Sequence, residues 1–248
     1  MKKTLITLLA LAGVAAADST VTPIASVTDY EISSSGFVSF SDTSSDWAAF
    51  DGKIDAAAGF TLQITLTDWS PANGPLFYLS TANTHTTALY NTSLATPSYS
   101  SLGNGEGWSG ACLHDSTNGS MKSPSVTYSP SNTLSSLPSH SGRSIDTTLF
   151  VTGKNGSVTL YEVGTDFQLV QVCSTTNVST GVAQSIVFAE WARENGSHTT
   201  NGNRATMSVS AYDGILTKEQ MTALVPEPTT ATLSLLALAG LAVRRRRK

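Results

Sequence analysis

The sequence predicts an all-β protein in which two antiparallel sheets pack face to face as a sandwich. Charged residues make up only 13% of the 248 residues, so side chains that favour exposed helix faces are scarce. Short runs rich in Thr, Val and Ser alternate with apolar residues and are separated by Asn-Gly and Gly-Pro turns. A chain of 25.9 kDa fits one domain of this kind.

The clearest strand is residues 60–67, where Phe60, Leu62, Ile64 and Leu66 share one face and Thr and Gln the other. This is the pattern of a half-buried antiparallel strand. Further strands are expected at residues 36–40, 148–152, 157–163, 184–189 and 204–211. An Asn-Gly turn at 155–156 predicts a hairpin between two of them. Residues 116–144, rich in Ser and Pro, are expected to form a long surface loop.

One short amphipathic helix is predicted near the end, over residues 216–224. Thr217 is its expected N-cap, and Gln220 three residues later completes a capping box. Because so short a helix does not persist alone, its apolar side chains must dock on the strands. The residues expected to be buried are Tyr212, Ile215, Leu216, Met221 and Leu224.

The charge pattern separates the middle of the chain from its ends. The net charge is -4, but Lys2, Lys3 and residues 244–248 supply 7 of the 14 basic residues. Residues 18–243 hold the other 7 and all 18 acidic residues, so they carry -11 (7 minus 18). No basic face can be assembled from the middle, which excludes nucleic acid as a partner.

The first 17 residues have the layout of a secretory signal peptide. Lys2 and Lys3 precede an apolar run at 5–14, and Ala15 and Ala17 form an A-x-A cleavage site. A buried N-terminal helix would not need lysines before the run and small residues after it. We therefore expect export, with Asp18 as the first mature residue.

The last residues combine a short motif, an apolar run and a basic end. Pro226, Glu227 and Pro228 precede residues 229–243, which are followed by four arginines and Lys248. The apolar run is slightly short of the ~20 residues that span a bilayer, and its leucines lie all around the helix rather than on one stripe. The basic end is expected to stay on the cytoplasmic side.

In this order of features the C-terminus resembles the PEP-CTERM sorting signal of Gram-negative bacteria. The resemblance implies recognition by an exosortase-type membrane enzyme, removal of the tail, and release or attachment at the outer surface. The expected organisation is therefore a signal peptide at 1–17, one domain at 18–224 and a sorting signal at 225–248.

A second resemblance concerns the domain itself. Residues 209–221 resemble the last strand and closing turn of LamG-like, concanavalin A-like jelly rolls, and residues 58–64 and 160–164 resemble two earlier strands of that family. The resemblance implies an antiparallel jelly-roll sandwich over about residues 25–224. Trp69 comes later than the family's strand Trp, and Glu162 and Val163 stand where the family has Val-Asp/Asn, which puts a ligand role there in doubt.

No catalytic motif is present. Glycosidases on related jelly rolls need two carboxylates at a fixed separation, but Glu190 and Glu194 on one strand would lie about 13 Å apart. The four histidines lack zinc spacing, and no Gly-x-Ser-x-Gly elbow occurs. The predicted function is a non-catalytic module that binds a glycan or extracellular polymer, or is structural. The alternative is a secreted glycoside hydrolase-like enzyme with unrecognised catalytic residues.

The remaining candidates each have two interpretations. Asp46, Asp51 and Asp55 could hold calcium, because carboxylate oxygens are its usual ligands. Acids in loops are more often simply solvated, so the expectation is that the protein has no cofactor. Cys112 and Cys173 allow one disulfide in an exported chain, or two buried thiols.

Aromatic side chains could also stack on sugar rings. Trp108, in a glycine-rich loop, is either a sugar-stacking ligand contact or packs over its loop. Trp47, Trp69 and Trp191 flank strands and are expected in the core.

Overall fold

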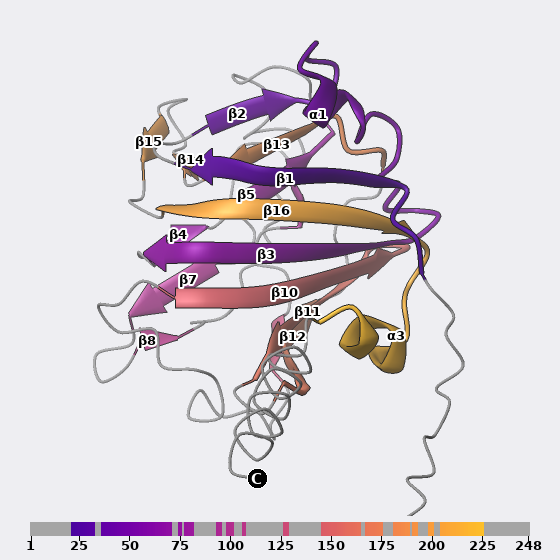
Figure 1. The fold of residues 1–248 in the computed structure, drawn as a ribbon, viewed down its shortest axis with the longest axis vertical. Helices are drawn as coiled ribbons and strands as arrows, with labels where there is room; N and C mark the ends of the chain where they lie inside the picture. Colours follow the sequence, from indigo (N-terminus) through magenta and orange to yellow (C-terminus); the bar gives the residue numbers. More distant parts are fainter. Residues whose placement is uncertain are drawn as a thin grey trace, which may run out of the picture.

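The computed structural model describes residues 21–32, 36–70, 74–75, 77–81, 93–95, 98–101, 106–107, 126–128, 145–164, 167–175, 181–188, 190–192, 198–200 and 204–225. Within them, the larger sheet has the strand order β1-β16-β3-β10-β11-β12-β9 (Figure 1). Its strands are β1 (Ala25–Ile32), β16 (Arg204–Asp213), β3 (Phe60–Ser70), β10 (Ile145–Lys154), β11 (Ser157–Val163), β12 (Leu169–Thr175) and β9 (Val126–Tyr128).

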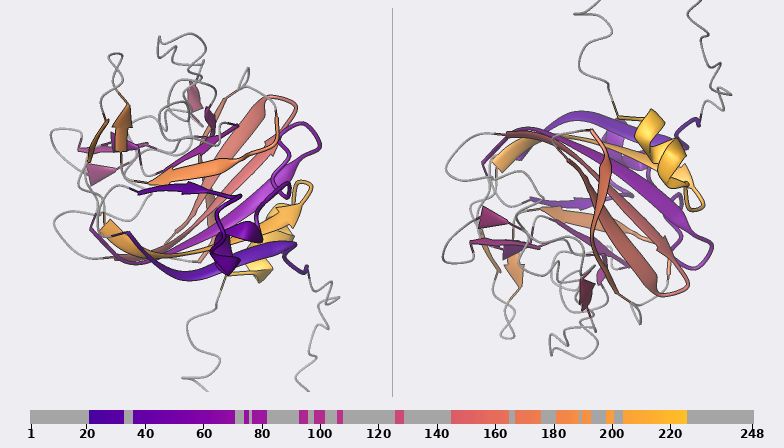
Figure 2. Two further views of the ribbon diagram at one scale, coloured as in Figure 1. Left: turned by 90° about the horizontal axis from the view of Figure 1, so that it is seen from above. Right: turned by 90° about the horizontal axis from the view of Figure 1, so that it is seen from below.

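A smaller sheet has the order β2-β13-β5-β6, with β2 (Gly36–Ser39), β13 (Ser185–Phe188), β5 (Phe77–Ser80) and β6 (Ser93–Ala95). Two short ladders join β14 (Glu190–Ala192) to β15 (His198–Thr200), and β4 (Gly74–Pro75) to β7 (Ser98–Ser101) and β8 (Glu106–Gly107). The larger sheet curves around the smaller one (Figure 2). The antiparallel two-sheet jelly-roll sandwich is thus confirmed, with the first strand paired to the last long one.

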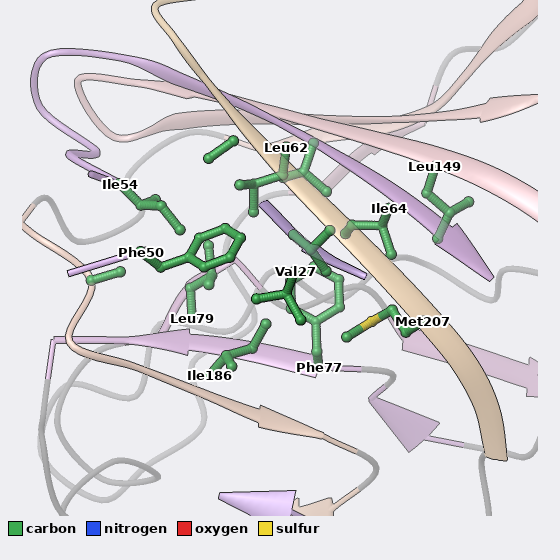
Figure 3. Packing of buried hydrophobic residues seen from close by; sticks show 14 of the residues in the cluster. Val27, Phe50, Ile54, Leu62, Ile64, Phe77, Leu79, Leu149, Ile186 and Met207 are labelled. Atoms are coloured by element: carbon green, nitrogen blue, oxygen red, sulfur yellow. The ribbon is translucent and has the colours of Figure 1, made fainter. Parts of the chain in front are cut away.

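The core lies between the two sheets. Phe60, Leu62, Ile64 and Leu66 all face it and are fully buried, as their alternation predicts. Figure 3 shows side chains from both sheets meeting there, among them Phe77, Leu79 and Ile186 from the smaller sheet and Leu62, Ile64 and Leu149 from the larger.

Aromatic residues extend this core on one side. Trp47 lies on the single-turn helix α1 (Ser45–Ala48), and its ring contacts those of Tyr30 and Phe188, with centroids 5.0 and 5.7 Å away. Trp47 and Trp69 are both buried, as expected, whereas the side chain of Trp191 lies outside the described part.

The predicted hairpin is confirmed as β10 and β11, paired from Leu149 with Glu162 to Lys154 with Ser157. Asn155 and Gly156 make its turn with φ of 48° and 79°, the left-handed pair that a type I′ turn requires. Gly153 lies directly against the ring of Phe60, where a Cβ would come within 2.5 Å of the ring. The backbone therefore approaches this ring more closely than any larger residue would allow.

Two long strands, β1 and β12, were not predicted from the sequence. Each carries a register shift, in β1 between Val27 and Tyr30 and in β12 opposite Leu160 and Tyr161. Asp29, with φ of 54°, lies in the first of these irregularities. An inserted residue shifts the side-chain alternation by one position, so the period-2 pattern disappears from the sequence.

The prediction of one long loop over residues 116–144 is wrong in part. Residues 126–128 form β9, which pairs with the edge strand β12. A three-residue strand has too few side chains to show a period. The other residues of that stretch lie outside the described part.

Residues 1–20 and 226–248 also lie outside the described part. The expected signal peptide, the Pro226 to Pro228 motif and the apolar run at 229–243 therefore stay predictions. Among the described residues, no helix is long and apolar enough to cross a membrane.

Candidate functional site

Two features of the described fold stand out: a segment that closes the domain just before the tail, and a buried carboxylate on the inner face of the larger sheet. The inner face is the one turned toward the smaller sheet, and the outer face is turned away from it. The closing segment, residues 214–225, contains α3 (Lys218–Ala223) and packs on the outer face (Figures 1 and 2).

The local geometry of α3 matches the sequence prediction. The Thr217 side chain accepts a hydrogen bond from the Gln220 backbone N–H at 3.2 Å, and the Gln220 side chain accepts one from the Thr217 N–H at 2.9 Å. This is the predicted capping box. Both bonds join residues only three apart, so they do not depend on the rest of the fold.

Tyr212, Leu216 and Met221 are buried as predicted, and Leu224 is half-buried. The prediction for Ile215 is wrong, because 52% of its surface is exposed. The adjacent Leu216 backbone N–H donates to a side chain on β3, which directs Leu216 inward and leaves Ile215 facing solvent.

Two polar residues of β3 hold the two ends of the closing segment. The Thr61 hydroxyl donates to the Gly214 carbonyl at 2.9 Å and accepts from the Leu216 N–H at 3.0 Å. Gln63 donates through Nε2 to the Leu224 carbonyl at 3.0 Å. Its Oε1 accepts from the Tyr212 hydroxyl at 2.9 Å. Both side chains lie on the face of β3 expected to be solvated, yet Thr61 is fully buried because the closing segment covers it.

The closing segment forms a second hydrophobic cluster, separate from the main core. Its buried members are Phe150, Val163, Tyr212, Leu216, Met221 and Val225. Val21 is among the partly buried residues packed against it, so the first and the last described residues of the chain meet in one cluster. The two ends of the described chain, Val21 and Val225, therefore lie in the same region of the domain.

The titratable side chains around the closing segment interact with their immediate neighbours. Burial raises the pKa values of Tyr161 and Tyr212 above their usual 10.0. The Lys218 ammonium lies 5.7 Å from the centre of the Tyr161 ring, within the range of a cation–π contact. Hydrogen bonds from its own backbone N–H and with Thr217 lower the pKa of the exposed Glu219.

The buried carboxylate is Glu162 on β11, with 0% of its surface exposed. It lies opposite Leu149, a core residue, and two residues after Leu160, another core residue, so it occupies the inner face. Thr147 on β10 donates its hydroxyl to Glu162 Oε1 at 3.2 Å. The inner face is therefore apolar along most of its length and polar at this end.

Glu162 was noted in the sequence only as a departure from the family pattern. Its alternation with Val158 and Leu160 would have placed it on the core-facing side of its strand. A charged residue at a core position of an alternating strand is the signal that could have identified it.

Within the side chains whose burial the structure describes, Glu162 is the one buried acid. Asp46 and Asp51 are exposed, and Asp55 Oδ1 accepts from the N–H groups of Ala57 and Ala58 at 2.8 and 3.2 Å. Asp46 lies in the first turn of α1, and Asp55 is the one of the three whose carboxylate accepts backbone hydrogen bonds in the turn that follows it. No group of three or more His, Cys, Asp or Glu side chains that could hold a metal ion occurs in the described part of the chain.

Several candidates remain untested. Trp108, Cys112, Glu194, Ala15, Ala17 and the residues Pro226, Glu227 and Pro228 lie outside the described residues. Cys173 lies on β12 and Glu190 on β14, but their side chains are not described. The disulfide between Cys112 and Cys173 thus stays a prediction.

No protein-family model and no curated protein matches the chain. Among solved structures, it is similar to the CBM40 of Ruminococcus gnavus IT-sialidase bound to α2,3-sialyllactose, with a TM-score of 0.46 and 9% identity over 82% of this chain and 98% of that one. It is also similar to a mutant of Trypanosoma rangeli sialidase displaying trans-sialidase activity, with a TM-score of 0.40 and 13% identity over 79% of this chain.

A GH54 α-L-arabinofuranosidase soaked with a cyclic sulfate inhibitor has a TM-score of 0.40 and 11% identity, over 82% of this chain and 42% of that one. The chain spans only 27% of the Trypanosoma rangeli structure and 28% of a structure described as NanB plus Optactamide. At these identities the likeness says nothing about the residues of a site.

Proposed function

We propose that the chain is an exported protein that is sorted through its C-terminal tail to the cell surface or beyond, and that its β-sandwich is the mature module. The observation that carries this proposal is the meeting of Val21 and Val225 in one cluster. In the sequence, an apolar, basic segment precedes the first of these residues and another follows the second. A signal peptide and a tail inserted in the same membrane could both be accommodated without unfolding the sandwich.

The test is an intact-mass measurement on protein extracted from the surface of a bacterium with a working exosortase-type enzyme. We expect a chain that begins at Asp18 and lacks residues 229–248. Tail residues still attached in that strain would contradict the proposal. A strain without the sorting enzyme is the control, and there the tail should remain.

We further propose that the module binds a glycan or extracellular polymer without catalysis, at the polar end of the inner face. The support is the buried carboxylate of Glu162, because burying it costs free energy that an apolar side chain at the same position would not. Glu162 is fully buried, so its role would be to orient the half-buried Thr147, which donates its hydroxyl to Glu162 Oε1 and is the side chain of this pair that a ligand can reach.

The hydrolase alternative needs a second carboxyl group about 5 to 9.5 Å from the first. A reducing-sugar release assay on any ligand found distinguishes binding alone from catalysis.

The binding test is a glycan array probed with the mature protein and with Glu162→Gln, which keeps the shape of the side chain and removes its charge. We expect at least a tenfold loss of signal for this variant. Asp146→Asn is the matched control, since Asp146 is an exposed acid that directly precedes Thr147 in the chain. Equal binding by a folded Glu162→Gln variant would contradict this site, and Thr147→Val provides a second variant if the first does not fold.

A further inference from the structure

One exposed aromatic side chain is held in a backbone conformation that aromatic residues rarely adopt. Phe167 lies in the turn between β11 and β12, with φ of 61° and 42% of its surface exposed. A positive φ suits glycine and is an outlier for a bulky residue, because the Cβ is crowded there. The turn thus carries a conformational cost that glycine at this position would avoid. Such a cost is typical of residues kept for a function of their side chain.

The turn that carries Phe167 is fixed on both sides. The Phe167 N–H donates to the Gly164 carbonyl at 3.0 Å, and the Gly164 N–H donates to the Gln168 carbonyl at 2.8 Å. Val163, before the turn, belongs to the second hydrophobic cluster, and Leu169, after it, packs against the same cluster. The backbone that bears the ring is therefore already ordered, which reduces the entropy lost when a ligand binds.

The turn lies beside Thr147 and Glu162. β10 and β11 pair Leu149 with Glu162, and the same antiparallel register continued by two residues brings Thr147 opposite Gly164. Facing residues of such strands have Cα atoms about 4.5 to 5.5 Å apart. Phe167 is bonded to Gly164 through its own N–H. The exposed ring, the half-buried Thr147 and the carboxylate that orients it therefore share one corner of the sandwich.

This corner has the two features that a sugar ring needs. One face of a pyranose carries C–H groups, which pack on an aromatic ring, and its edge carries hydroxyl groups. Because the Thr147 hydroxyl donates to Glu162, its oxygen can accept a hydrogen bond from a sugar hydroxyl. The ring of Phe167 would contact the face of the sugar and Thr147 its edge.

The charges around the corner are negative. Two exposed acids, Asp146 and Asp68, lie next to Thr147, and the Asp68 N–H donates to Asp146 Oδ1 at 3.0 Å. Residues 18–243 as a whole carry -11 (7 minus 18). A glycan that bears carboxylate or sulfate groups would be repelled by this field, whereas a neutral glycan would not.

We propose that Phe167 is the stacking surface of the glycan site and that the site takes a neutral glycan rather than an acidic one. This inference rests on the proposed glycan binding, to which it adds a contact residue and a ligand class.

The experiment probes an array of neutral and acidic oligosaccharides with the full-length protein and its variants. Phe167→Asn removes the ring and suits the backbone, since asparagine tolerates a positive φ. It should lose roughly tenfold or more of the affinity for the oligosaccharides that the natural protein binds. Phe167→Trp keeps an aromatic face and should keep the binding. Ile215→Ala is the matched control, because Ile215 is an equally large, exposed apolar residue outside the corner.

Phe167→Leu keeps apolar bulk without a flat ring, and it should lose binding as Phe167→Asn does if the latter does not fold. The inference is overturned if a folded Phe167→Asn or Phe167→Leu variant binds as strongly as the natural protein, even where Glu162→Gln has lost its binding. Binding confined to acidic oligosaccharides would also overturn it. If the natural protein binds no oligosaccharide on the array, the proposed glycan binding itself is overturned.

Discussion

Thr61→Val tests whether one hydroxyl group fastens the closing segment to the sandwich. The Thr61 side chain is fully buried and makes two hydrogen bonds, to the Gly214 carbonyl and from the Leu216 N–H. Valine has nearly the same shape, so packing is kept while both bonds are lost. The Leu216 N–H bond is buried, so that group is left without a partner in an apolar site.

The magnitude follows from these two bonds. Each hydrogen bond contributes about 1 kcal/mol net, and an unsatisfied buried N–H costs about 1 to 3 kcal/mol, so we expect a loss of about 2 to 4 kcal/mol in the free energy of unfolding. For a domain of this size that corresponds to a fall in Tm of roughly 5 to 15 °C.

The assay is thermal unfolding of the mature protein followed by circular dichroism. Thr65→Val is the matched control, since Thr65 lies on the same strand and face but is half-exposed. Its effect should stay within about 0.5 kcal/mol. If Thr61→Val has the same Tm as the Thr65→Val control, the Thr61 hydroxyl does not hold the closing segment and the argument from its burial fails.

Three further predictions concern the same domain. Leu216→Ala should cost about 2 to 5 kcal/mol in chemical denaturation, whereas Ile215→Ala, one residue away and exposed, should be neutral. Burial raises the pKa of Tyr212 in the folded protein. The stability that goes with its protonated hydroxyl is complete below the pKa of the unfolded state and is lost as the pH rises through the pKa of the folded state. The free energy of unfolding should therefore decline above about pH 10. Tyr212→Phe should flatten that decline in urea melts at several pH values, and an unchanged slope would refute it. Cys112 and Cys173, if paired, should stabilise the fold by roughly 4 kcal/mol, and two thiols titrating in the unfolded, unreduced protein would disprove the bond.

The sequence predicted the elements whose signal lies within a few residues. The alternation of Phe60 to Leu66 identified β3 and its buried face, and Asn155-Gly156 identified the hairpin. The capping box of α3 joins Thr217 to Gln220, three residues apart. Each of these three elements depends on a local period or a local hydrogen bond, and none of them needs a distant partner.

The sequence did not predict the elements where that local signal is interrupted or reversed. The irregularities in β1 and β12 hide their alternation. Ile215 was expected to be buried because a helix too short to persist alone must dock its apolar side chains, but the backbone bond of Leu216 to Thr61 directs Ile215 outward. A propensity argument contains no information about a partner so far along the chain.

The sequence by itself thus determined the class of fold, the positions of six of its strands, the capped final helix and the acidic middle between two apolar, basic ends. Tertiary structure alone decided that Thr61 and Gln63 form hydrogen bonds to a segment more than 150 residues away, and that Glu162 lies buried beside Thr147. Alternation and capping are set by neighbouring residues. The burial of Glu162 and the hydrogen bonds of Thr61 and Gln63 to the closing segment arise only when distant strands share a sheet and a later segment covers one of its faces.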